Sequence, residues 1–187
     1  MTLEQVEKKA LRLIEEISNT ENKLTDDPDI ENKLNDVTNQ VMFELCRLKK
    51  ILTTDTREVT AGEVLDLMTL ENFFQLKLLR CKNEAGEDVS YELIDNLAIF
   101  EEAGTAVVFY YRYPKAITFE TVPSEYEFEL PPEVLEIMPY GIAADLLKND
   151  VSTNYGQIYA KRYEDMKSML DPRYSTGSIS IEGGVDI

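Results

Sequence analysis

The sequence predicts an α+β protein that is mainly α: a helical bundle of about four helices with a small antiparallel β insert between the second and third long helices. Apolar residues recur at helical spacing near both ends of the chain, and shorter alternating runs lie between them. The composition, 43% hydrophobic and 29% charged, is that of a folded soluble protein. We therefore expect a helical body at 1–52 and 123–174, a β-rich insert at 53–122 and a flexible C-terminal tail at 175–187.

Two antiparallel helices are expected at the start of the chain. The first runs from about Leu3 to Ser18, and its buried stripe consists of Leu3, Val6, Ala10, Leu13, Ile14 and Ile17. Residues 19–23 form a connection. Asp27 precedes Pro28, so an acidic cap followed by proline at the first helical position predicts a second helix from Pro28 to about Ile51.

The middle of the chain predicts a small antiparallel meander, curled upon itself or laid on the helices. Residues 63–68 could form one helical turn. Alternation predicts a strand at 73–81, and two more strands are expected at 91–100 and 105–113, joined by a tight connection. A hairpin alone would be marginal, so these strands need a further layer to pack on.

The third helical segment begins at Pro131 and Pro132, and Pro139 should kink the helix or restart it. Within it, Gly141, Ala143 and Ala144 keep one surface thin enough for another backbone to approach. We therefore take Tyr140 and Gly141 as candidate partner-binding residues. Ser152 or Thr153 should cap the last helix, which ends at Asp171-Pro172 and carries an apolar stripe of Tyr155, Ile158, Tyr159, Tyr163, Met166, Met169 and Leu170.

The C-terminal tail contains a latent strand. Ile179 and Ile181 alternate with serines, and Val185 and Ile187 follow a glycine pair. We take these four residues as candidate partner-binding residues, because an unpaired strand can complete a sheet in a neighbouring protein. The alternative is a disordered terminus without such a role.

The net charge of −17 limits the classes of partner. Nucleic acids and anionic membranes are bound through Lys and Arg, so tight binding to either is not expected. A basic protein partner, or mimicry of DNA, stays open beside plain solubility. The N-terminus lacks an apolar signal core, which predicts a cytoplasmic protein, and Cys46 and Cys81 are expected to be buried free thiols.

No catalytic, cofactor-binding or metal site is predicted. The chain has no histidine, which removes the commonest general base and zinc ligand. Asp27, Asp29 and Glu31 alternate like the opening of a calcium loop, but Asn32 stands where glycine is required. Phosphate-binding and dinucleotide-binding glycine patterns are absent.

Three passages carry a more specific pattern: residues 24–30 (Leu-Thr-Asp-Asp-Pro-Asp-Ile), 110–114 (Tyr-Tyr-Arg-Tyr-Pro) and 135–147 (Leu-Glu-Ile-Met-Pro-Tyr-Gly-Ile-Ala-Ala-Asp-Leu-Leu). With the order of elements, they make the chain resemble the head-tail connector, or adaptor, proteins of tailed bacteriophages. The strand insert is larger than the minimal all-helical members of that family need.

The resemblance implies a structural virion protein and not an enzyme, without a cofactor. Copies would form a ring, commonly of twelve, that docks on the portal protein after DNA packaging and receives tail or head-completion proteins. The free protein would wait as a monomer in the host cytoplasm and then become part of the virion at the head-tail junction. Ring contacts and a terminal segment that orders on assembly are also implied.

Two other classes of function are weighed against this one. A small acidic regulatory protein would bind a basic, nucleic-acid-binding protein partner in a salt-sensitive way. A hydrolase using carboxylates and a metal ranks last, because no pair of carboxylates has a neighbouring group that would tune one as acid and the other as base.

Overall fold

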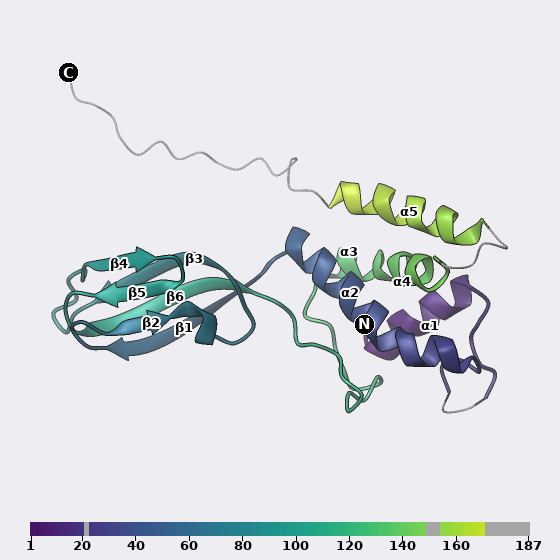
Figure 1. Cartoon of the computed structure of the whole chain (residues 1–187), viewed down its shortest axis with the longest axis horizontal. Helices are drawn as coiled ribbons and strands as arrows, with labels where there is room; N and C mark the ends of the chain where they lie inside the picture. The colour runs from purple at the N-terminus through teal and green to yellow at the C-terminus, as the bar shows by residue number, and fades with distance from the viewer. Residues whose placement is uncertain (21–22, 149–153, 171–187) are drawn as a thin grey trace, which may run out of the picture.

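The computed structural model describes residues 1–20, 23–148 and 154–170. Their helices and strands follow one another in the order shown in Figure 1. The helices are α1 (Leu3–Leu13), α2 (Pro28–Leu48), α3 (Pro132–Leu135), α4 (Met138–Leu146) and α5 (Tyr155–Met169), with a 3-10 turn η1 (Leu67–Thr69). The strands are β1 (Ile51–Val59), β2 (Val64–Asp66), β3 (Phe73–Lys82), β4 (Tyr91–Ile94), β5 (Leu97–Phe100) and β6 (Gly104–Arg112).

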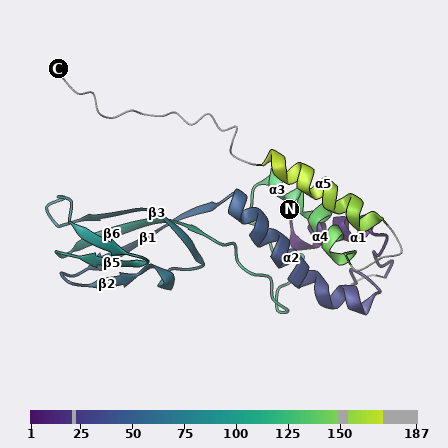
Figure 2. The same ribbon diagram turned by 45° about the horizontal axis from the view of Figure 1, so that its top comes forward.

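The helical body is layered around α4. This helix packs against α1 and α2 on one side and against α5 on the other (Figures 1 and 2). The expected helix starts are confirmed at two places: Thr2 closes a capping box with Gln5, and the Asp27 carboxylate accepts hydrogen bonds from the Asp29 and Ile30 N–H groups. The core contains fully buried side chains from three helices, Leu3, Val6, Leu11, Met42, Leu45, Met138 and Ile142.

The strands form a two-sheet module with its own core. One antiparallel sheet has the order β1-β6-β3 and the other the order β2-β5-β4. Both sheets bury alternate side chains in one cluster that is separate from the core of the helical body, and this cluster includes Leu65, Leu79, Phe100, Ala106 and Val108. In Figure 1 the module lies beside the helical body, at the far end of α2.

The predicted fold class is therefore wrong in its treatment of the strands. They are not a small insert supported by helices, because six described strands make two sheets that stabilise each other. No strand was predicted at β1, and its first residue, Ile51, was assigned to the end of the second helix. The single strand predicted at 91–100 is in fact two strands, β4 and β5, because the chain turns at Asp95, whose φ is +53°.

Other boundaries changed less. The first helix ends at Leu13 instead of near Ser18. It cannot continue, because Glu15 has a left-handed backbone with a φ of +61°. Pro139 restarts the helix, since it stands in the first turn of α4 just after α3 ends. The two candidate caps Ser152 and Thr153 lie outside the described residues.

The chain passes between the helical body and the β module twice, and polar contacts stabilise each connection. At the first, the Lys50 ammonium lies 5.1 Å from the centroid of the Tyr111 ring and donates a 2.7 Å hydrogen bond to Gln75. At the second, Arg112 donates two hydrogen bonds to the Glu129 carboxylate. These bonds lower the pKa of Glu129 below its usual value, which keeps the pair ionised.

One ionisable side chain lies inside the helical core. Glu7 of α1 is fully buried, and its only hydrogen bond within the described residues comes from Thr38 Oγ1 at 3.4 Å. Desolvation by burial raises the pKa of Glu7 from 4.5 to about 7, although the Thr38 bond opposes the shift. The folded protein therefore binds this proton more tightly than the unfolded chain does.

We expect the Glu7→Gln variant to change the dependence of stability on pH. The contribution of Glu7 to stability is fully present below pH 4.5 and is lost as the pH rises through about 7. The loss amounts to on the order of 3 kcal/mol for a shift of this size. Urea unfolding of the unmodified protein and of Glu7→Gln, at about pH 5 and at about pH 8, measures the free energy of unfolding. If the two proteins differ in this free energy by the same amount at both pH values, Glu7 does not have a raised pKa.

Candidate functional site

The structure places only some of the predicted partner-binding residues. Tyr140 and Gly141 lie next to each other on α4, in the middle layer of the helical body. Ile179, Ile181, Val185 and Ile187 lie outside the described residues. The expectation that these residues bind a partner therefore stays a prediction.

Gly141 is a point of close approach within this chain. A Cβ atom on Gly141 would lie 2.8 Å from Cε2 of Tyr163 on α5 and 3.0 Å from Cγ1 of Val41 on α2. Real Cβ contacts essentially never come under 3.0 Å. The thin surface of α4 therefore accommodates the Tyr163 ring of its own chain.

The neighbouring side chains hold α5 against α4 by electrostatics as well as packing. The Arg162 guanidinium lies 4.5 Å from the centroid of the Tyr140 ring. Lys167 pairs with Glu44 of α2 at 2.7 Å and also with Glu164. Burial raises the pKa of the Tyr163 hydroxyl, so this group stays protonated.

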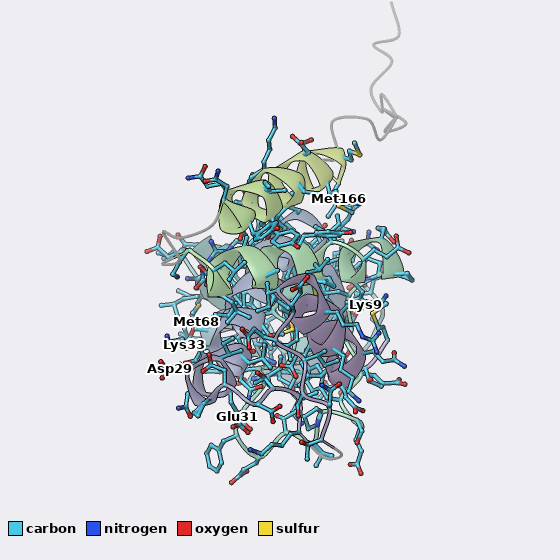
Figure 3. The ribbon with its side chains drawn as sticks, turned by 90° about the vertical axis from the view of Figure 1, so that its right-hand side faces the viewer. Lys9, Asp29, Glu31, Lys33, Met68 and Met166 are labelled. Carbon is cyan, nitrogen blue, oxygen red and sulfur yellow. The ribbon has the colours of Figure 1, made fainter. Side chains whose placement is uncertain are left out.

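Next to the face of α5 that packs on α4 lie apolar residues that stay largely exposed among the described residues. Tyr155 is 60% exposed, Ile158 55% and Met169 80%. They recur at positions i, i+3 and i+14, so they lie along one side of the helix. We call Tyr155, Ile158 and Met169 the outer stripe of α5. Figure 3 shows α5, marked by Met166, as the outermost layer of the helical body.

A second exposed apolar feature lies in the long connection between β6 and α3. Phe119 is 92% exposed and Val122 is 49% exposed. They belong to a hydrogen-bonded turn at 118–122, which we call the loop tip: the Thr121 N–H donates to the Thr118 carbonyl, and the Thr118 N–H donates to Thr121 Oγ1 at 2.9 Å. The turn presents Phe119 to solvent in a fixed position.

The loop tip is tied to the helical body from both sides. The Asn39 amide of α2 accepts a 2.8 Å hydrogen bond from the Ile117 N–H and donates one of 2.7 Å to the Ile117 carbonyl. On the other side, the Pro123 and Tyr126 carbonyls accept hydrogen bonds from the first N–H groups of α1. The loop tip was not predicted from the sequence, although Phe119 stands between Thr118 and Thr121 in a segment bounded by Pro114 and Pro123.

Neither the cavities nor the reactive side chains of the described residues form a cluster that resembles a catalytic or metal site. A cavity of about 240 Å³ lies between α2, α4 and α5, with Glu44, Asp145 and Tyr163 among its lining residues. No group of three or more His, Cys, Asp or Glu side chains that could hold a metal ion occurs in the described part of the chain. Burial raises the pKa of the Cys46 and Cys81 thiols, which makes them poor nucleophiles.

No protein-family model matches this sequence, and no curated protein matches it. Among the described residues, no helix is both long and apolar enough to cross a membrane.

We expect Gly141→Ala to destabilise the helical body. The alanine gains up to about 1 kcal/mol in helix propensity, but the added Cβ overpacks the contact with Tyr163 at a cost of roughly 1–3 kcal/mol. Urea unfolding measures the net loss. In a Tyr163→Leu background the cost of Gly141→Ala should fall, because the ring is gone; an unchanged cost would place the clash elsewhere.

We expect Asn39→Ala to loosen the loop tip while leaving the rest of the fold in place. The substitution leaves the Ile117 N–H and carbonyl without partners, at a cost of about 1–3 kcal/mol each. Chymotrypsin cleaves after phenylalanine, so cleavage after Phe119 should become several-fold faster than in the unmodified protein. Asn39→Asp keeps the oxygen that accepts the hydrogen bond from the Ile117 N–H, so its cleavage rate should lie between those of the unmodified protein and Asn39→Ala. Equal cleavage rates for all three proteins would show that the Asn39 hydrogen bonds do not hold the loop tip.

Proposed function

We propose that the protein is a structural virion component of the head-tail connector, or adaptor, type, which assembles as a ring on the portal protein and joins head to tail. The observation that carries the proposal is the exposure of large apolar side chains on firmly held elements. Phe119, Met169 and Tyr155 stand out from the surface on a clamped loop and on a packed helix. Side chains presented in this way are typical of surfaces that become buried on association.

The sequence resemblance and the net charge support the same proposal. Residues 24–30, 110–114 and 135–147 resemble proteins that pack against copies of themselves and against the portal. A net charge of −17 suits a ring through which DNA must pass without adhering, since like charges repel the phosphate backbone. In this proposal the protein transforms no substrate, acts in the host cytoplasm during assembly and remains in the virion.

The C-terminal residues have a distinct place in the proposed assembly. The alternating apolar residues of 175–187 would add a strand to a neighbouring protein, because main-chain hydrogen bonds and alternate side-chain pockets suit such a segment. Tail or head-completion proteins, the portal and a second copy are the candidate neighbours.

Mixing the purified protein with the portal protein of the same phage should give a discrete ring complex. Removing residues 175–187 should abolish that complex without changing the melting temperature, because the missing strand would act between molecules. Sedimentation and thermal unfolding measure the two properties.

A matched control keeps the full length of the chain but changes Ile179 and Ile181 to serine. This variant should assemble as poorly as the truncated protein. The proposal fails if the unmodified protein does not associate with the portal, and salt-sensitive binding to a basic protein would instead favour an acidic regulatory role.

A further inference from the structure

The sheet β2-β5-β4 has an apolar surface on the side that faces away from the core of the β module. Directly paired residues of antiparallel strands point to the same side of a sheet. The pairing register therefore places four aliphatic and two acidic side chains on this side, in one row of Val64, Ile99 and Glu92 and a second row of Asp66, Leu97 and Ile94. Leu65 and Ala98, which lie between the two rows, point the other way and are buried. We call Val64, Ile94, Leu97 and Ile99 the open face of the β module.

The open face lacks a covering layer within the described residues. Val64 is 52% exposed, Ile94 47% and Leu97 40%. In Figures 1 and 2, the described α-helices all lie to one side of the β module, and none of them covers this sheet. An antiparallel sheet that faces water on one side usually has polar residues there, whereas β5 reads Leu-Ala-Ile-Phe and is apolar on both sides. Such a strand is typical of a sheet that is covered on both sides.

The outer face of the other sheet has a different character. On β1-β6-β3, Thr56, Val107 and Arg80 form one row, and Glu58 and Lys82 stand in the next row. That face therefore combines apolar residues with hydroxyl groups and with charges of both signs, as a solvated surface does. The contrast indicates that the open face is a site of interaction and not a general property of the β module.

The strands of this sheet and the segments next to them carry only negative charges. Residues 60–72 hold three carboxylates and residues 87–104 hold six, and neither segment contains a lysine or an arginine. Glu92 and Asp66 stand at opposite corners of the surface that the open face forms. A second copy docked by the same face would bring these acids together, and the phosphates of nucleic acid or anionic lipid would be repelled in the same way. The partner that fits this surface therefore combines apolar side chains with cations.

We propose that the open face binds an amphipathic helix of a partner protein, with an apolar stripe that is flanked by lysine and arginine. A helix is about 10 Å across, which matches the distance of about 10 Å between the first and the third of three neighbouring strands. Laid on the sheet, the helix supplies the missing layer, and its cations pair with Asp66 and Glu92. Asp66 is held in place for this contact, because its carboxylate also accepts a 2.9 Å hydrogen bond from the Met68 N–H. This inference goes beyond the proposed function and does not depend on it.

An NMR titration of the full-length, isotope-labelled protein tests the contact. The probe is a synthetic amphipathic helix of about four turns, made only of leucine and lysine. Its addition should shift the backbone amide signals of β2, β4 and β5 until the site is saturated, while the signals of β1 stay in place. Two control peptides should give much smaller shifts: one with the same composition in scrambled order, and one with glutamate in place of lysine.

A matched pair of variants locates the apolar part of the contact. Leu97→Thr removes apolar surface but keeps a side chain suited to a strand, so it should weaken binding of the leucine-lysine peptide about ten-fold. Leu78→Thr on β3 is the control, because Leu78 is 39% exposed and Leu97 is 40% exposed. The control should lower the melting temperature by a similar amount without changing the affinity for the peptide.

A second pair of variants tests the charges. Glu92→Gln should weaken binding of the peptide and reduce the dependence of its affinity on salt, since one charge pair is lost. Glu120→Gln makes the same change in charge at the loop tip of the helical body, and it should leave both properties nearly unchanged.

The inference is overturned if the shifts fall outside β2, β4 and β5, if a control peptide binds equally well, or if Leu78→Thr weakens binding as much as Leu97→Thr. Two other occupants are tested with the same variants. Dimers of the protein alone that sediment as monomers after Leu97→Thr would assign the open face to a second copy. Vesicles of anionic lipid that bind the unmodified protein but not Leu97→Thr would assign it to a membrane, and either result overturns the inference.

Discussion

The helical body depends on the close approach of the Tyr163 ring to Gly141. The middle helix α4 must contact α1 and α2 on one side and α5 on the other, so it has little room for side chains on the side that meets Tyr163. Tyr163 and Leu170 are the only buried residues in the described part of the last helical segment. That helix is therefore held along one edge, which leaves Tyr155, Ile158 and Met169 largely exposed among the described residues. One packing constraint accounts both for the stability of the layer and for the surface that it presents.

The connection between β6 and α3 also combines a residue that is held in the core with a residue that is exposed to solvent. Ile117 is buried, and its backbone groups are both bonded to Asn39, whereas Phe119 two residues later is almost fully exposed. A long connection without regular structure is usually either mobile or functional. The clamp on Ile117 limits the loss of conformational entropy when the tip meets a partner, because the tip is ordered beforehand. Preorganisation is what makes a small apolar contact useful in assembly.

Local patterns predicted the helices well and the strands poorly, for a physical reason. Caps and 3.6-residue periodicity are properties of a few neighbouring residues, so Thr2, Asp27 and Pro28 mark their helices without help from the rest of the chain. In contrast, β1 has the sequence Ile-Leu-Thr-Thr-Asp-Thr-Arg-Glu-Val and little apolar alternation, and it is a strand because Ile51 to Val59 pair with β6 far along the chain. The turn at Asp95 is a different case, because Asp95-Asn96 is a polar two-residue loop between Ile94 and Leu97 and its residues tolerate a left-handed backbone. Here a local signal was present in the sequence and was missed.

The candidate site shows the same limit of sequence reasoning. Glycine and alanines predicted a thin surface on α4 but not which helix would approach it. Along α5, Tyr155, Ile158 and Met169 share the periodicity of Tyr163 and Leu170, and periodicity cannot say which of two adjoining apolar faces is buried. Exposed apolar side chains favour association, and the net charge of −17 opposes it through repulsion between copies. Weak apolar contacts and strong mutual repulsion together favour assembly only where a template brings the copies together.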